Sequence, residues 1–91
     1  MAQQQDFEKL RERLLENKKW PMRYMFKFIV PNQEGKVDQV VALLPKHGTV
    51  SFKHTKNFRH VSVTCVVSMK SADSIIDVTT KASAIEGVIS L

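Results

Sequence analysis

The sequence predicts one small α+β domain, and two observations support this prediction. Residues 20–31 and 59–69 carry apolar side chains at every second position, which is the pattern of β-strands with one strongly apolar face. The segments between and after them carry apolar residues at helical spacing. The chain has 91 residues and is 43% apolar, which is enough for a single hydrophobic core.

The first element is an N-terminal helix over residues 6–18. Phe7, Leu10 and Leu14 follow one another at i, i+3 and i+7 and form an apolar stripe on a charged segment. A helix of this length is marginal in water by itself, so the stripe must pack against another surface. We therefore divide the chain into an N-terminal helical extension, residues 1–19, and a domain, residues 20–91.

The central strand is the aromatic stretch 20–31, bracketed by Pro21 and Pro31. Residues 31–35 have the composition of a turn. A helix follows, because Val37, Val40, Val41 and Leu44 lie at i, i+3, i+4 and i+7. Pro45 marks its end, and we expect Gly48 to be its C′ residue.

A β-hairpin comes next, with strands over residues 49–55 and 59–69. Lys56, Asn57 and Phe58 form the turn, although no glycine supplies the positive φ that such turns favour. Ser71 is a suitable N-cap for a second core helix. The apolar stripe of that helix consists of Ala72, Ile75, Ile76, Thr79, Ala82 and Ser83. Gly87 ends the region, and residues 88–91 form a short last strand.

The order from residue 20 onward is β-α-β-β-α-β, which predicts a ferredoxin-like sandwich. Four antiparallel strands then lie in the spatial order 4-1-3-2, with two helices on one face. We expect Phe26, Phe28, Val61 and Val63 to point toward the helices. The opposite, open face then contains Met25, Lys27, Ile29, Ser51, Lys53, Ser62, Thr64, Val66 and Ile89.

The open face has an apolar centre, and such a face is commonly covered by a helix or a partner. The stripe of the N-terminal helix is the candidate cover, either within one chain or across a dimer. Our candidate self-association residues are therefore Phe7, Leu10, Leu14, Met25, Ile29 and Val66.

The net charge of +5 is unevenly distributed, because residues 39–72 contain no acid. A region of one sign attracts anions or an acidic partner. Our candidate residues for anion or partner binding are Lys53, Lys56, Arg59 and His60. This basic hairpin also leaves RNA binding as an alternative function. The open face has no aromatic residue on which bases could stack, so we consider nucleic acid the less favoured partner.

No catalytic, cofactor or metal site emerges from the residues. Cys65 shares the parity of Val63 and Val67, which places its thiol in the core. No glycine-rich loop is present to hold a phosphate. His54 and His60 have opposite parity and should diverge, which argues against a shared metal ion. We expect no enzyme and no cofactor.

Several phrases carry a family resemblance: WPMRYMFKFIVP, KNFRHVSVTCVVSM, SADSII and IEGVISL. Together they resemble the YbeD-like family of small bacterial proteins, which carry a domain of unknown function, and in particular its Bacteroidetes-type branch. The resemblance implies a ferredoxin-like fold similar to ligand-binding ACT domains, and it implies no activity. Many relatives have glycine followed two residues later by tyrosine, where this chain has Phe58 and His60.

We therefore expect a small non-enzymatic regulatory or binding module. It would self-associate and bind a small ligand or a protein partner. With one cysteine, no apolar run of membrane-spanning length and a polar start, we expect a cytoplasmic protein without a membrane anchor.

Overall fold

The computed structural model describes residues 7–91, and the predicted order of elements is present in it. Seven elements follow one another along the chain: α1 (Phe7–Leu15), β1 (Met22–Pro31), α2 (Lys36–Leu43), β2 (Thr49–His54), β3 (His60–Met69), α3 (Ala72–Ser83) and β4 (Ile89–Ser90). The predicted start of the first helix, Asp6, lies outside the described residues.

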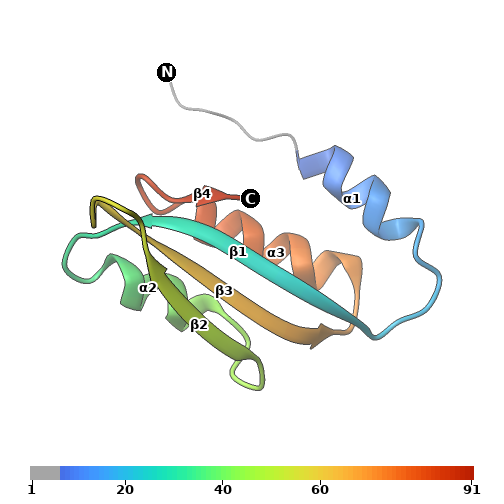
Figure 1. Cartoon of the computed structure of the whole chain (residues 1–91). Helices are drawn as coiled ribbons and strands as arrows, with labels where there is room; N and C mark the ends of the chain where they lie inside the picture. Colours follow the sequence, from blue (N-terminus) through green and yellow to red (C-terminus); the bar gives the residue numbers. More distant parts are fainter. Residues whose placement is uncertain (1–6) are drawn as a thin grey trace.

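The four strands form one antiparallel sheet in the order β2-β3-β1-β4, which is the predicted order counted from the other edge. β1 and β3 pair over their full length, with Phe28 opposite Val63. Figure 1 shows α2 and α3 together on one side of this sheet. The ferredoxin-like sandwich is therefore confirmed.

The core lies between the sheet and these two helices. Phe26, Phe28, Val61 and Val63 are all buried, as predicted, and Cys65 is buried with them. Period-two alternation places these side chains on one face of β1 and β3. On α3 the buried residues are Ala72, Ile75, Val78, Thr79 and Ala82, so our predicted stripe omitted Val78 and included the half-buried Ile76 and Ser83.

Local sequence explains where the core helices begin and end. The Ser71 hydroxyl accepts a hydrogen bond of 3.1 Å from the Ser74 amide, and the Ser74 hydroxyl receives one from the Ser71 amide, a complete capping box. α2 ends at Leu43, because Leu44 precedes a proline and is already extended, with φ −78° and ψ 149°.

The expectation that Gly48 is the C′ residue of α2 is wrong, because α2 ends at Leu43 with Leu44 as its C-cap. The glycines with positive φ among the described residues are Gly35 and Gly87. A Cβ atom on Gly48 would lie 2.7 Å from the Cys65 Sγ and 2.9 Å from the Val67 Cβ. Glycine is needed there because the turn before β2 passes directly against the side chains of β3.

Within one chain, the N-terminal helix does not cover the open face of the sheet, where we expected its apolar stripe to pack. Packing across a dimer stays a prediction. α1 packs against α3, beside the core layer of helices (Figure 1). Leu14 is 6% exposed there, and the Arg11 Nη2 lies 3.2 Å from the Asp73 Oδ1. α3 offers the side of a helix to this stripe, whereas the open sheet face carries cations among its apolar side chains. None of the helices in residues 7–91 is long and apolar enough to cross a membrane.

Candidate functional site

The turn of the β2–β3 hairpin holds a bulky residue in an uncommon backbone conformation. Phe58 has a φ of +61°, the left-handed region that a side chain of this size rarely adopts. Its amide donates to the Thr55 carbonyl at 2.9 Å, and the next amide, that of Arg59, donates to the Asn57 Oδ1 at 3.0 Å. Phenylalanine thus fills the turn position that we expected to favour glycine.

Asn32, in the loop after β1, ties this turn to the body of the domain. Its side-chain amide donates to the Phe58 carbonyl at 2.8 Å, and its main-chain amide donates to the Arg59 carbonyl at 2.8 Å. The Thr55 hydroxyl lies 3.2 Å from both the amide and the carbonyl of His60. The surrounding hydrogen bonds therefore hold the strained residue in place.

Aromatic side chains are exposed along β2 and the turn. Phe52 is 55% exposed and Phe58 is 65% exposed. The rings of His54 and Phe58 lie 5.3 Å apart, centre to centre, at a tilt of 48°. Phe52 and His54 pair with Val63 and Val61 and so share the helix-side face of the sheet. α2 packs against β1, β3 and α3 rather than along β2, which leaves these rings in solvent.

Sequence reasoning missed this aromatic surface, which we define as Phe52, His54 and Phe58. Parity correctly assigned Phe52 to the helix side, but the helix side of an edge strand is not necessarily covered. The sequence signal was present in the hairpin turn, where phenylalanine stands instead of glycine.

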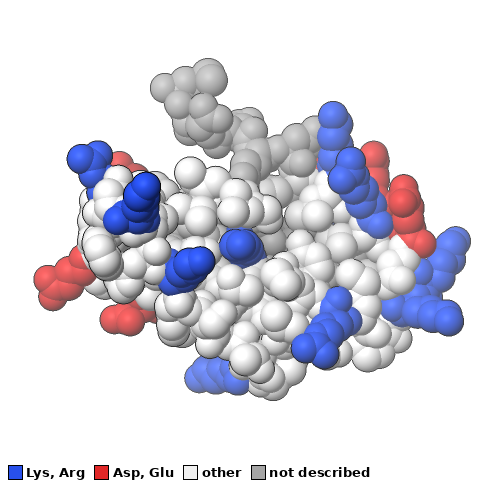
Figure 2. All heavy atoms as spheres, viewed as in Figure 1, with Lys and Arg blue, Asp and Glu red and all other residues white. Residues whose placement is uncertain are grey.

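The predicted binding residues lie on the same hairpin as the aromatic surface. Lys53, Lys56 and Arg59 are exposed, and His60 is half-buried at the start of β3. Lys53 and His60 lie on the open face of the sheet, opposite the Phe52 ring, whereas Lys56 and Arg59 lie in the hairpin turn. Figure 2 shows Lys and Arg side chains over the middle of one face of the molecule, with Asp and Glu side chains gathered toward its two ends. The four residues stay candidates for anion or partner binding.

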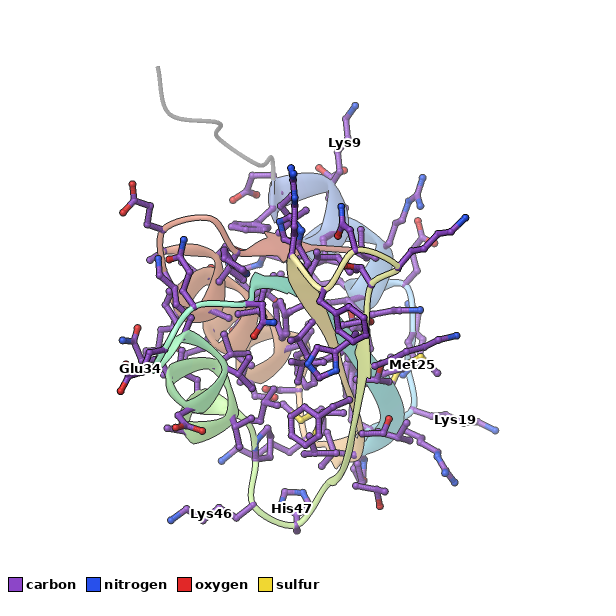
Figure 3. All side chains as sticks on the ribbon, turned by 60° about the vertical axis from the view of Figure 1, so that its left-hand side comes forward. Lys9, Lys19, Met25, Glu34, Lys46 and His47 are labelled. Carbon is purple, nitrogen blue, oxygen red and sulfur yellow. The ribbon has the colours of Figure 1, made fainter. Side chains whose placement is uncertain are left out.

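The structure divides the predicted self-association residues between two places. Leu14 is buried and Phe7 and Leu10 are half-buried on α1, whose partner surface is α3. Met25, Ile29 and Val66 lie on the open face, where Met25 is 58% exposed and the other two are half-buried. Figure 3 shows Met25 directed away from the body of the domain, on the opposite side of the view from Glu34.

The open face combines these apolar side chains with positive charge. Arg23 and Lys27 share the parity of Met25 on β1, and Lys53 lies on the same face of β2. The described strands β1 to β4 contain no aspartate or glutamate. The open face and the hairpin thus form one basic half of the domain.

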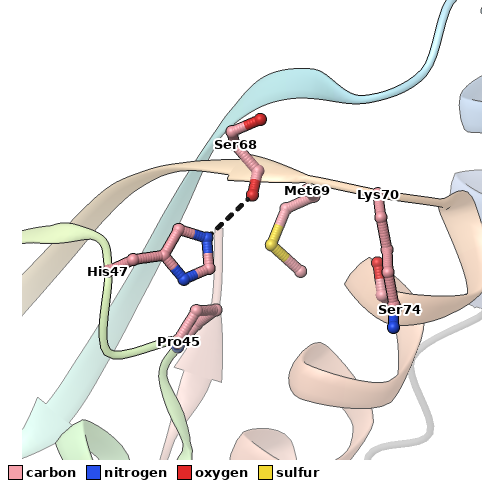
Figure 4. Close-up of a pocket in the computed structure, with 6 residues that line it drawn as sticks. All are labelled: Pro45, His47, Ser68, Met69, Lys70 and Ser74. Atoms are coloured by element: carbon pink, nitrogen blue, oxygen red, sulfur yellow. Dashed lines mark hydrogen bonds between the residues drawn. The ribbon is translucent and has the colours of Figure 1, made fainter.

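A pocket of roughly 330 Å³ lies between the turn before β2 and the start of α3. Pro45, His47, Ser68, Met69, Lys70 and Ser74 line it (Figure 4). The His47 Nε2 is 3.1 Å from the Ser68 carbonyl oxygen, and the Ser74 hydroxyl donates to the Ser71 carbonyl at 2.6 Å. Two of its polar side chains therefore already have protein partners.

Cys65 lies in the core with an exposure of 0%, and burial raises the pKa of its thiol. Both properties oppose formation of a reactive thiolate. In residues 7–91 there is no group of three or more His, Cys, Asp or Glu side chains arranged to hold a metal ion.

No curated protein and no solved structure matches the chain. A match does come from the family described as "Protein of unknown function (DUF493)", over residues 16–91. It supports the resemblance to the YbeD-like family, while the Bacteroidetes-type branch and the likeness to ACT domains stay predictions. Because the match covers the whole ferredoxin-like domain and most of the chain, the protein belongs to the DUF493 family.

Proposed function

We propose that this domain is a non-enzymatic binding module that recognises an acidic protein partner through the β2–β3 hairpin. One observation carries the proposal. The hairpin holds exposed phenylalanine side chains among cations, within a stretch that has no acid from residue 39 to residue 72.

Aromatic residues and arginine dominate the binding energy of many protein interfaces. The aromatic surface offers such anchors, and Phe58 is presented on a turn fixed by hydrogen bonds. A fixed anchor loses little conformational freedom on binding. The surrounding charge would steer an acidic partner toward the hairpin.

A second copy of the chain is a weaker candidate for this surface. The open face and the hairpin carry Arg23, Lys27 and Lys53 without an acid, so two copies would meet with like charges. Self-association through Met25, Ile29 and Val66 stays a proposal of lower rank. We place the module in the cytoplasm, where a lone buried thiol such as Cys65 suits the reducing environment.

The test replaces Lys53, Lys56 and Arg59 together by Gln in the full chain. In a pull-down, we expect this variant to lose the acidic proteins that the wild type captures. Capture by the wild type should fall steeply as salt is added, because exposed charges are screened over about 8 Å at physiological ionic strength. The matched control replaces Lys9, Lys18 and Lys19 by Gln, which removes the same charge outside the hairpin. Equal capture by wild type and both variants, with unchanged melting temperatures, would reject the proposal.

Single-stranded RNA is the second candidate, and the exposed rings are the observation that favours it. Bases stack on aromatic side chains beside cations in many single-strand binders. Titration with a mixed-sequence RNA oligonucleotide, with fluorescence anisotropy as the readout, separates the two candidates. Two results would favour RNA over the protein partner. The affinity for RNA would fall in the Phe58→Ala variant, and ribonuclease would abolish capture in the pull-down.

A further inference from the structure

The sheet has two free edges, and they differ in length. β4 spans Ile89–Ser90, whereas β2 spans Thr49–His54 and is exposed over most of its length. Native proteins commonly protect edge strands by shortening them or by inserting proline or a bulge. β4 is short, but β2 contains no proline and pairs with β3 residue for residue. In the part of the chain that the structure describes, no strand pairs with the outer edge of β2.

The register determines which main-chain groups face that edge. The Thr55 amide donates to the carbonyl of His60, directly opposite, at 3.0 Å, so the main chain of Thr55 faces β3. The His60 amide donates to the Thr55 hydroxyl. Hydrogen-bonded and non-hydrogen-bonded pairs alternate in an antiparallel ladder. Lys53 and Ser51 therefore bond to β3. The amides and carbonyls of Val50, Phe52 and His54 point outward.

The same residues carry their side chains on the helix-side face, where α2 does not pack along β2. An added strand would thus find main-chain partners on Val50, Phe52 and His54. Its side chains opposite these residues would contact the Phe52 and His54 rings. The Phe58 ring lies beside His54 and extends this line of rings to the turn. On the other face, residues of the added strand would lie beside Lys53.

We propose that the outer edge of β2 receives an extended segment of a partner protein as a fifth strand. Apolar and acidic residues alternate in this segment, with the apolar ones on the aromatic surface and the acidic ones beside Lys53. This inference rests on the proposed function and deepens it by naming the mode of binding, which is strand addition.

Charge argues for another protein rather than a second copy at this edge. Antiparallel pairing of two β2 strands about Phe52 would set Lys56 of one copy opposite Gly48 of the other. Lys46 and His47 lie next to that glycine, and Figure 3 shows both at the turn before β2. At each end of the paired strands, positive charges of both copies would therefore lie close together. An acidic segment would instead neutralise these charges.

The test uses the full chain labelled with ¹⁵N and a short capped peptide in which valine and glutamate alternate. A peptide of the same composition, with valines and glutamates in separate blocks, is the control. We expect the alternating peptide to slow amide exchange at Val50, Phe52 and His54, and to leave the amides of β4 unchanged. We expect at least tenfold weaker binding of the block peptide. Binding without protection of these three amides, or equal binding of both peptides, would overturn the inference.

A pair of variants isolates the main-chain contribution. Phe52→Ala and Phe52→Pro both remove the ring, but only the proline removes the outward amide, and edge strands tolerate proline at such a position. We expect the proline variant to bind about fivefold more weakly than the alanine variant, the value of one ordinary hydrogen bond. Equal affinities, with both variants folded by circular dichroism, would overturn strand addition. If the basic triple variant still loses its acidic partner in that case, the proposed function stands and only the mode of binding fails.

Discussion

The two faces of the sheet are built by the same strands and differ in what covers them. On the helix side, Phe26, Phe28, Val63 and Cys65 are almost completely buried. On the open side, Met25 precedes Phe26 along β1 and is 58% exposed. Apolar side chains occur on both faces, so apolarity alone does not decide which face becomes the core.

The difference lies in the charges between the apolar residues. Along the helix-side face of β1 the side chains from Phe26 to Val30 are apolar, whereas Lys27 interrupts Met25 and Ile29 on the open face. Burying a lysine without a partner is costly, so the helices pack on the face without charges. In residues 7–91 the helices leave the open face and the β2 edge uncovered, and our proposals concern these uncovered surfaces.

The largest expected effect tests the covered face. Phe28→Ala should lower the free energy of unfolding by about 3–5 kcal/mol, because a buried ring is replaced by a cavity. Met25→Ala, three positions away on the opposite face, should change it by less than about 0.5 kcal/mol. Urea denaturation of both variants measures the two values. Similar losses would mean that the open face is also buried in solution.

A smaller effect tests the surface between α1 and α3. Leu14 is 6% exposed and the adjacent Leu15 is 55% exposed, so they form a matched pair on one helix. We expect Leu14→Ala to cost about 2–3 kcal/mol, toward the lower end of buried leucine truncations. Undocking of α1 limits this loss, because the rest of the domain keeps its own core. Leu15→Ala should be nearly neutral.

Amide hydrogen exchange locates the change caused by Leu14→Ala. Faster exchange in Phe7–Leu15, with β1 and β3 unchanged, is the expected pattern. Uniformly faster exchange throughout the sheet would contradict docking of α1 as a separate unit.

The smallest of the three effects tests how closely the turn before β2 packs against the side chains of β3. Gly48→Ala should cost about 1–3 kcal/mol, because the new methyl group would overlap the Cys65 and Val67 side chains. Ser51→Ala, on the exposed face of β2, serves as the control and should change stability by less than about 0.5 kcal/mol. Thermal denaturation measures both. No loss for Gly48→Ala would mean that the turn can move away from β3.

The sequence by itself determined the order of the elements, the ferredoxin-like topology and the face on which Phe26, Phe28, Val61 and Val63 lie. These features follow from short-range causes. The period of two assigns faces along a strand, and the Ser71 cap starts α3 through a contact three residues away. The cationic hairpin was also visible, because charge is a property of composition.

Only the tertiary structure decided where α1 packs, that Phe52 is exposed and why residue 48 is glycine. An apolar stripe such as that of Phe7, Leu10 and Leu14 fits any apolar surface, and the sequence does not rank the surfaces available to it. Phe52 has the parity of a core residue, yet it remains in solvent because α2 lies over β1 and β3 instead of the edge strand. Exposure and close approach are relations between elements distant in the chain, so they exist only once those elements are assembled.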